Sequence, residues 1–349
     1  MSTLANSHSA NGRPAVTLAD IAKRCSLSKG SVSRALSMTA DDCPLSLATW
    51  TRVREVAAEM GYRVNVQARA LASGRSMSIG LLYEGTLPLL DSVYHQIIET
   101  FSATLREHGY QLALVALDET DQWEDALLGG RVDGCVCLHN LPPRLEKLLP
   151  RMQRPLVLLN GTSALASGSI SVDDRGGAEL VTRHLLGLGH QRLLMLTDTQ
   201  HETPHHSIAE RQAGFLQTVR GAGDAEALFF EGDGDAFAAA WSGFDAVPTA
   251  VVCYSHVEAV GALRVLHRAG VDVPGDVSLA TFNDVFPVAQ LDPALTCVAV
   301  PSAEIGRRAA DMLLGLLNGD PGPEVATRKV VLAPTLITRE STAAAPAPA

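Results

Sequence analysis

The chain has 349 residues, of which 46% are hydrophobic and 19% are charged. This length predicts two or three domains, and the composition is typical of a folded globular protein and not of a disordered one. No apolar run approaches the roughly 20 residues that span a bilayer. Residues 1–16 lack the apolar stretch of a secretory signal. We therefore expect a cytoplasmic protein.

The net charge of −10 is distributed unevenly along the chain. Residues 1–78 contain ten Lys or Arg and five Asp or Glu, whereas the remaining residues contain 18 and 33. A basic N-terminal head on an acidic body indicates a polyanionic partner at the head only, although chance clustering in a short window would give the same balance.

The cysteines fall in apolar segments and are Cys25, Cys43, Cys135, Cys137, Cys253 and Cys297. In a chain of this length such positions favour reduced, buried thiols. The alternation of Cys135 and Cys137 is typical of a buried strand, which favours a structural role over a metal or redox site. We expect no metal and no cofactor.

The first predicted element is a short helix that begins after Thr17. Leu18, Ile21, Ala22 and Cys25 recur at the spacing of one helical face, Thr17 suits the N-cap, and Asp20 suits the first turn. A break at residues 26–27 separates this helix from a second one, capped by Ser28 and running through Val32 and Leu36. Two short helices joined by a tight turn form a helix-turn-helix.

The exposed face of the second helix combines cationic and short polar residues, namely Lys29, Gly30, Ser31, Ser33 and Arg34. Such a helix fits the major groove of DNA, where Lys or Arg binds guanine edges and hydroxyl groups bind phosphates. A third helix is predicted over residues 46–60, with a buried stripe of Trp50, Val53, Val56, Ala57 and Met60. The competing interpretation is a small helical bundle with a solvated basic face. The agreement of caps, turn, polar face and charge favours DNA binding.

Residues 16–79 resemble the N-terminal part of the lactose-repressor/galactose-repressor family of bacterial regulators. The matching stretches are TLADIAKRCSLSKGSVSRAL, TRVREVAAEMGYRVNVQARALASGRS and SIGLL. The resemblance implies a hinge helix over residues 65–72 that folds on DNA, with Leu71 inserted into the minor groove. It also implies DNA contacts by Thr17, Ser28 and Asn65. The ordinary alternative for Leu71 is a linker leucine.

Four departures from the family pattern affect the expected operator and not the expected fold. Ser26 stands at a turn position usually held by glycine, and Gly30 stands where a larger base-reading side chain is common. The loop at residues 39–44 is longer than in the best-known members, and Val64 replaces a common proline. Lys29 and Arg34 remain as the main candidates for sequence readout.

Beyond residue 78 apolar strands alternate with amphipathic helices. The expected strands are residues 78–83, 110–117, 134–138, 155–160, 192–197, 250–254 and 277–281. The expected helices are residues 93–108, 176–188, 208–220 and 257–269. Two series of βα units predict an α/β fold with two lobes, each a doubly wound parallel sheet, and a ligand beyond the carboxyl ends of the strands.

The resemblance extends to about residue 340 through RVDGCVCL, SVDDRGGAELVTRHLLGLGHQRLLML, ERQAGF, AVGALRVLHRAGVDVPGDVSLATFND and LDPALTCVAVP. It implies a body similar to periplasmic sugar-binding proteins.

We expect a tail over 1–14, the helix-turn-helix domain over 15–63, and the hinge and linker over 64–77. The effector-binding and dimerisation domain follows over 78–340, with one lobe of 78–173 and 302–321 and another of 174–301 and 322–340. Residues 341–349, STAAAPAPA, are expected to be disordered.

The resemblance implies effector-binding residues at positions that match the family or lie near its cleft. They are Asp91, Tyr94, Asn160, His205, His206, Arg211, Ser255, His256 and Asn283. The Arg211 guanidinium suits paired hydroxyls or a carboxylate, although a helix-surface arginine is the alternative. Ser255 and His256 replace the usual Asn-Asp pair, which indicates either an effector other than a simple neutral sugar or a different binding geometry.

The segment HETPH at residues 201–205 matches the metalloprotease pattern H-E-x-x-H. Pro204 would break the continuous helix that this chemistry needs, and we expect Thr203 to cap the next helix with Pro204 at its start. No other catalytic constellation is present, so we expect no enzyme. The tail lacks the leucine heptads of a tetramerising coiled coil, so we expect a homodimer.

The sequence thus predicts a DNA-binding transcription regulator, most often a repressor in this family, whose affinity for a pseudo-palindromic double-stranded operator changes when a small molecule, expected to be a carbohydrate, binds between the lobes. A cytoplasmic sugar-binding module without operator binding is the main alternative. A hydrolase that uses the histidines of residues 201–206 is the third.

Overall fold

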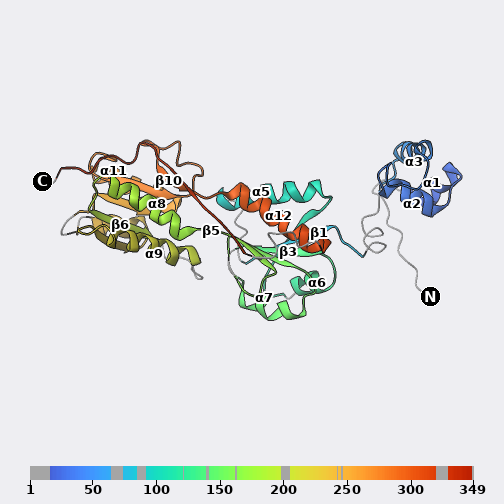
Figure 1. The fold of residues 1–349 in the computed structure, drawn as a ribbon, viewed down its shortest axis with the longest axis horizontal. Helices are drawn as coiled ribbons and strands as arrows, with labels where there is room; N and C mark the ends of the chain where they lie inside the picture. The colour runs from blue at the N-terminus through green and yellow to red at the C-terminus, as the bar shows by residue number, and fades with distance from the viewer. Residues whose placement is uncertain are drawn as a thin grey trace. The chain divides into compact units, whose positions relative to one another are not determined.

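A computed structural model describes residues 16–63, 74–84, 92–120, 122–138, 141–161, 163–197, 205–241, 243–244, 247–319 and 329–347 (Figure 1). The chain divides into two compact units, Met1–Gly74 and Arg75–Ala349. The predicted hinge residues Asn65 and Leu71, the cleft candidate Asp91, and residues 201–204 of the HETPH segment lie outside the described residues. Their roles stay predictions.

Among its described residues, the first unit contains three helices, α1 (Leu18–Cys25), α2 (Lys29–Ser37) and α3 (Leu47–Glu59). Their apolar faces meet in a small core in which Ile21, Val32, Ala35 and Val53 are fully buried. The predicted stripe of the third helix packs into this core. Thr17, Ser28 and Ser46 cap the three helices through their hydroxyl oxygens, which accept backbone N–H groups that the first turn leaves unpaired.

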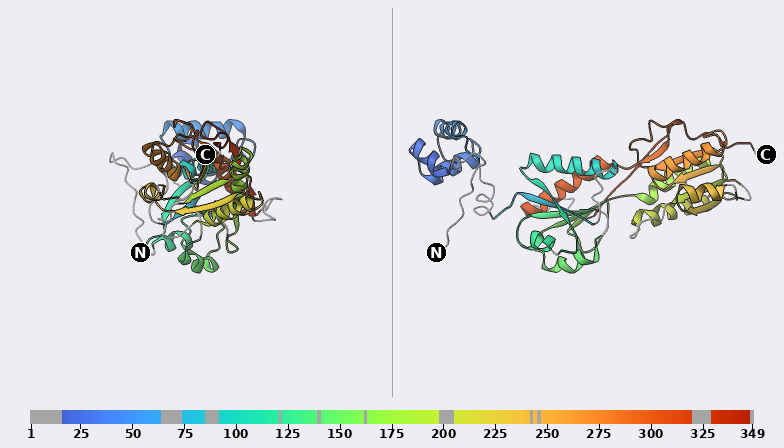
Figure 2. Two further views of the ribbon diagram at one scale, coloured as in Figure 1. Left: turned by 90° about the vertical axis from the view of Figure 1, so that its left-hand side faces the viewer. Right: turned by 180° about the vertical axis from the view of Figure 1, so that it is seen from behind.

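The first lobe of the second unit is built on a six-stranded parallel sheet of order β11-β5-β4-β3-β1-β2. Its strands are β1 (Ser78–Tyr83), β2 (Gln111–Ala116), β3 (Gly134–Leu138), β4 (Leu156–Leu159), β5 (Gly168–Val172) and β11 (Lys329–Leu332). Helices α5 (Ser92–Glu107) and α12 (Ser302–Asn318) cover one face, and α6 (Gln122–Leu128) and α7 (Pro143–Leu148), with the 3-10 turn η2 (Leu149–Arg151), cover the other (Figures 1 and 2).

Strands β1, β3 and β4 are nearly continuous apolar runs because both faces of the sheet are covered. Ile79 and Leu81 of β1 point into the core beneath α5 and α12, and Leu82 points into the core on the α6 and α7 side. Successive side chains of a strand alternate between its faces. This alternation fixes the register, in which Ile79 pairs with Leu112 of β2 and with Gly134 of β3.

The second lobe repeats the design on a sheet of order β12-β10-β9-β8-β6-β7, in which only the β12 pairing is antiparallel. Its strands are β6 (Arg192–Thr197), β7 (Glu226–Glu231), β8 (Ala250–Cys253), β9 (Ser278–Phe282), β10 (Thr296–Ala299) and β12 (Thr335–Ile337). Helices α8 (Asp174–Gly187) and α9 (His206–Arg220) cover one face, and α10 (Gly234–Trp241) and α11 (His256–Arg268) cover the other. The predicted α/β class with two doubly wound lobes is confirmed.

The described residues correct three boundaries of the sequence-based prediction. Strand β11, at residues 329–332, pairs with β5 of the first lobe, so the third crossing between lobes falls at residues 333–334 and not near 322. Helix α9 begins at His206 and is capped by His205, not by Thr203. Residues 341–347 belong to the described fold, so the expectation of a disordered tail over 341–349 was wrong for them.

The segment after residue 340 is held by polar contacts with the second lobe. Ser341 is fully buried; its hydroxyl donates to the carbonyl of Leu279 at 2.5 Å and accepts the backbone N–H of Thr296 at 2.8 Å. The buried His190 ring lies 3.1 Å from the carbonyl of Ala343 and 2.9 Å from the Ser278 hydroxyl. A buried imidazole needs such partners, which is why a segment of disorder-prone composition is fixed here.

We expect the stability of the second lobe to fall as the pH is lowered through mildly acidic values. Burial lowers the pKa of His190 below its ordinary value of 6.5, so the folded state binds fewer protons there than the unfolded state. The stabilisation is complete above the ordinary pKa and is lost as the pH falls from it towards the lowered pKa of the folded state. Thermal unfolding at about pH 7.5 and about pH 5.5 measures this difference.

The variant His190→Gln removes the titrating group, and His267→Gln, at an exposed position on α11, is the matched control. The pH dependence should become shallower in His190→Gln and stay unchanged in His267→Gln. An unchanged slope in both variants would rule His190 out as its source.

Candidate functional site

The candidate DNA-reading surface is the exposed face of α2. Ser26 adopts the left-handed conformation, with φ of 57°, and it turns the chain between α1 and α2 at a position where the resemblance described above leads us to expect glycine. The Ser28 hydroxyl oxygen accepts the backbone N–H of Ser31 at 3.1 Å, which fixes the first turn of α2. The predicted capping roles of Thr17 and Ser28 therefore use the same hydroxyl groups that we expected to contact DNA.

Lys29, Gly30, Ser33 and Arg34 are exposed on α2, and Ser31 is half-buried. Among the described residues, neither Lys29 nor Arg34 forms an ion pair. Two uncompensated cations therefore lie on the exposed face of a short capped helix, Lys29 at its first residue and Arg34 in its last turn. A polyanion can therefore bind both side chains without first breaking an ion pair within the protein.

Arg54 on α3 is a structural residue that the sequence reasoning missed. Its guanidinium donates to the carbonyls of Ala35 at 3.2 Å and Met38 at 3.3 Å, and it lies 4.3 Å from the centre of the Trp50 ring. The Trp50 indole N–H also donates to the carbonyl of Met38, at 3.1 Å. These contacts satisfy carbonyls at the end of α2 and so fix its direction relative to α3.

The candidate effector site is centred on Arg211, a buried residue of α9. Its Nε donates to Asp174 Oδ1 at 2.8 Å, Nη2 lies 2.7 Å from the same oxygen, and Nη1 donates to the carbonyl of Tyr254 at 2.6 Å. The guanidinium also lies over the Phe282 ring, 3.9 Å from its centre. The alternative interpretation of Arg211 as a surface residue is wrong, since its side chain is only 6% exposed.

Polar groups connect this site to the first lobe. Asn160 follows β4, and its carbonyl oxygen lies 2.8 Å from Nε2 of His205. His205 Nδ1 accepts the backbone N–H of Ser207 at 3.3 Å, which assigns the ring hydrogen to Nε2 and makes His205 the donor to Asn160. The Ser207 hydroxyl lies 2.8 Å from the Tyr254 hydroxyl. The chain of contacts therefore runs from a strand end of one lobe to a strand end of the other.

Three buried polar atoms beside this chain have no hydrogen-bond partner among the described residues: Asn160 Oδ1, Asp174 Oδ2 and His206 Nδ1. Asp174 is 3% exposed and Asn160 is 8% exposed. Asp174 Oδ2 lies 3.8 Å from Nε2 of His206. Burial lowers the pKa of His206 and outweighs the opposing effect of Asp174, which favours a neutral ring. Because Nε2 is the ring nitrogen that lies towards the Asp174 carboxylate, we place the hydrogen on Nε2, which leaves Nδ1 as an acceptor. All three atoms can therefore accept a hydrogen bond from a bound molecule.

The other predicted residues occupy different places around the site. Tyr94 is buried, and its hydroxyl accepts from Asn160 Nδ2 at 3.4 Å. The Ser255 hydroxyl caps α11 by accepting the backbone N–H of Val257, and it donates to Glu258. Asn283 has φ of 74° after β9 and lies 3.5 Å from His256. Asp174 was not among the predicted site residues, although it follows a buried strand end within the quoted SVDDRGG motif.

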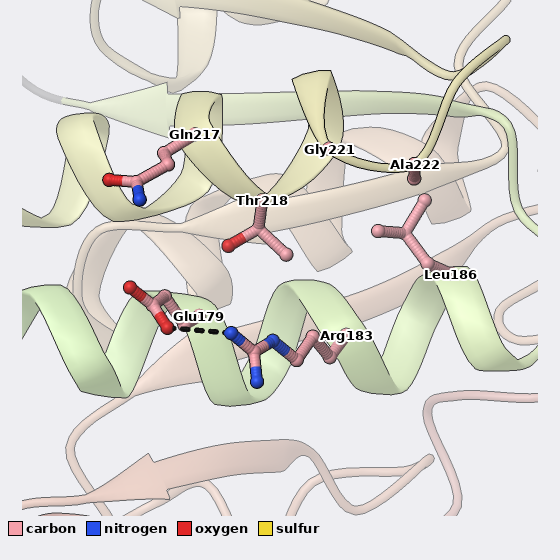
Figure 3. A pocket seen from close by; sticks show the side chains of 7 residues that line it. All are labelled: Glu179, Arg183, Leu186, Gln217, Thr218, Gly221 and Ala222. Carbon is pink, nitrogen blue, oxygen red and sulfur yellow. Dashed lines mark hydrogen bonds and ion pairs between the residues drawn. The ribbon is translucent and has the colours of Figure 1, made fainter.

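A separate groove of about 310 Å³ lies between α8 and α9 on the second lobe (Figure 3). The Glu179–Arg183 ion pair of α8 faces Gln217 and Thr218 of α9 across it. None of the predicted effector residues lines this groove.

The described part of the chain contains no group of three or more His, Cys, Asp or Glu residues arranged to hold a metal ion. All six cysteines are buried and free. Among the helices that the structure describes, none is long and apolar enough to cross a membrane.

Comparisons with known proteins cover nearly the whole chain. A model of the periplasmic binding protein-like domain matches residues 182–342. The chain is 31% identical over 354 residues to the HTH-type transcriptional regulator reg1 of Streptomyces lividans, which covers 94% of this chain and 97% of that protein.

Solved structures of other regulators share the fold. The lac repressor dimer bound to operator and the anti-inducer ONPF matches with a TM-score of 0.78 and 23% identity, over 95% of this chain and all of that one. The complex of the transcriptional regulator CelR with cellobiose matches with a TM-score of 0.66 and 25% identity, over 93% of this chain and 99% of that one. The similarity therefore includes both units described above.

Proposed function

This chain belongs to the LacI family of HTH-type transcriptional regulators, and we propose that it is a dimeric repressor that releases its operator when a neutral carbohydrate binds. The main support is the capped helix α2, with exposed and unpaired Lys29 and Arg34. A helix of this kind reads base edges from the major groove, and a two-fold dimer reads two half-sites of a pseudo-palindrome. We propose that it acts in the cytoplasm.

The effector class follows from the chemistry of the buried site. Asp174 neutralises Arg211, and the three unpartnered atoms Asn160 Oδ1, Asp174 Oδ2 and His206 Nδ1 are acceptors. A carboxylate or phosphate ligand would face the Asp174 carboxylate, which is unfavourable at low local dielectric. Hydroxyl groups can donate hydrogen bonds to these acceptors. They can also accept hydrogen bonds from the N–H groups of Arg211 that its contacts with Asp174 and Tyr254 do not use. Of the two alternatives raised by the replacement of the Asn-Asp pair at residues 255–256, this favours a different binding geometry. In it, Asp174 supplies the carboxylate that residues 255–256 lack.

Exposed apolar side chains on the second lobe support a dimer. Val257 is 65% exposed and Val260 is 36% exposed on α11, and Phe286, in the loop after β9, is 74% exposed. His256 and Asn283, which lie 3.5 Å apart, connect the start of α11 to that loop. Contiguous exposed apolar side chains are typical of protein–protein interfaces, and we propose that these three residues contribute to one.

Operator binding is tested with the purified full-length protein and a pool of random DNA duplexes at physiological salt. Sequencing of the retained duplexes should show one enriched pseudo-palindromic sequence, because non-specific binding is weak under these conditions. No enrichment would overturn the proposal and favour the alternative of a carbohydrate-binding module without operator binding.

The effector class is tested by thermal unfolding with neutral mono- and disaccharides and with the matching uronic acids and sugar phosphates. A ligand that binds only the folded state raises the melting temperature. We expect neutral sugars alone to raise it and to weaken operator binding. The rise should be lost in Asn160→Ala and kept in Arg175→Ala, whose exposed side chain pairs with Glu210 outside the site. If only the acids act, the effector class is wrong while the operator result stands.

A further inference from the structure

Two residues at the start of the second unit, Ser76 and Met77, are fixed by one buried carboxylate. Asp133, which is 2% exposed, accepts the backbone N–H groups of Ser76 at 2.7 Å and Met77 at 2.9 Å. It also accepts the Ser76 hydroxyl at 3.0 Å. Met77 has φ of 56°, a conformation uncommon for a residue other than glycine. Its carbonyl accepts the backbone N–H of Gln111 at the start of β2. The end of the linker from the DNA-binding unit thus has a defined path.

Arg75 connects the same segment to helix α12. Its guanidinium donates to the carbonyl of Leu317 at 3.0 Å and to the side-chain oxygen of Asn318 at 3.3 Å. These residues form the last turn of α12, whose free carbonyls and dipole favour a cation. Leu317 lies 242 positions after Arg75 in the chain, and Asn318 lies 243 positions after it.

Helix α12 is suited to transmit movement along its length. It spans Ser302–Asn318 and begins directly after Pro301, where the chain passes from β10 of the second lobe to the first. Seventeen residues of α-helix extend about 25 Å. At Gly306 a Cβ atom would lie 2.3 Å from the carbonyl oxygen of Ile97, so α12 packs closely on α5 and has little freedom to bend there.

We propose that Arg75 and Asp133 are positioning residues that couple the lobes to the DNA-binding unit. Asp133 holds the end of the linker on the first lobe, and Arg75 ties it to the end of a helix whose other end begins at a lobe crossing. A change in the angle between the lobes displaces the start of α12, and the Arg75 contact carries that displacement to the linker. The inference rests on the proposed function, because it requires that DNA binding and lobe arrangement are linked.

Linkage is reciprocal, so a coupling between the lobes and DNA binding can be measured as the effect of DNA on the lobes. This measurement does not require that the effector is known. The probe is the pseudo-palindromic duplex selected by the wild-type protein, and the readout is hydrogen exchange of the first-turn amides of α12, at residues 303–306. We expect the duplex to change their exchange rates by about fivefold or more in the wild-type protein. In Arg75→Ala the duplex should still bind, and the change at residues 303–306 should be lost.

Arg307→Ala is the matched control, because it removes an arginine from α12 that pairs with Glu304 and Asp311 and not with the linker. It should behave as the wild-type protein does, and Arg75→Lys, which keeps the cation, should recover part of the response. If Arg75→Ala keeps the full response, or the wild-type protein shows none while it binds the duplex, the inference is wrong. Failure to select any duplex would instead count against the proposed function.

Discussion

Asp174→Ala is expected to lower the free energy of unfolding of the second lobe by about 3–5 kcal/mol, because it leaves the buried Arg211 guanidinium without its counterion. Two of the three hydrogen-bond donors that Arg211 uses lie within 2.8 Å of Asp174 Oδ1. Water cannot replace the carboxylate cheaply, since both side chains are almost fully buried. Denaturant unfolding monitored by far-UV circular dichroism measures the loss.

Glu210→Ala is the matched control for this prediction. It breaks the Arg175–Glu210 pair, whose side chains are 47% and 46% exposed, and should change the stability by less than about 1 kcal/mol. The double variant Asp174→Leu with Arg211→Met removes both charges and should cost less than Asp174→Ala alone. A loss in Asp174→Ala as small as that in Glu210→Ala would show that the pair does not stabilise the lobe.

The elements with a clear apolar period were predicted from the sequence. The strands at β1, β2, β3, β4, β6, β8 and β9 and the helices at α5, α8, α9 and α11 have the predicted type, with ends that differ by at most two residues. Strands β5, β7, β10, β11 and β12 were not predicted. The five-residue β5, GSISV, carries few large apolar side chains, and the edge strand β7 is half-exposed. Their pairing depends on neighbours distant in the chain, which a local pattern does not contain.

The candidate site was predicted in part for the same reason. Asn160, His205 and Arg211 follow recognisable motifs, and the structure brings them into one connected cluster. Asp174 was missed as the partner of Arg211 because the two residues are 37 positions apart. The composition of the tail predicted disorder. The contact that holds the tail could not be inferred from that composition, because the buried His190 lies 153 residues before Ala343.

Removal of the cations on α2 is expected to have the largest effect on operator binding. Arg34→Ala and Lys29→Ala should each weaken binding to the selected duplex by about 1–3 kcal/mol, which is the range for loss of a base-reading contact. Both side chains are exposed, and neither belongs to the core of the first unit, so its fold should remain. Titration of a fluorescent duplex at fixed salt measures the affinity of each variant.

The two roles that a cation on α2 can have are separated by repeating the titrations with mismatched duplexes and at several salt concentrations. Loss of a base contact relaxes specificity at one position, whereas loss of a phosphate contact weakens all duplexes alike and lowers the salt slope by about 1. Arg220→Ala, an exposed arginine at the end of α9, removes the same charge from the other unit and should leave both quantities unchanged. If Lys29→Ala and Arg34→Ala bind as tightly as Arg220→Ala does, α2 is not the helix that reads DNA, and the exposed cations on its face have no part in recognition.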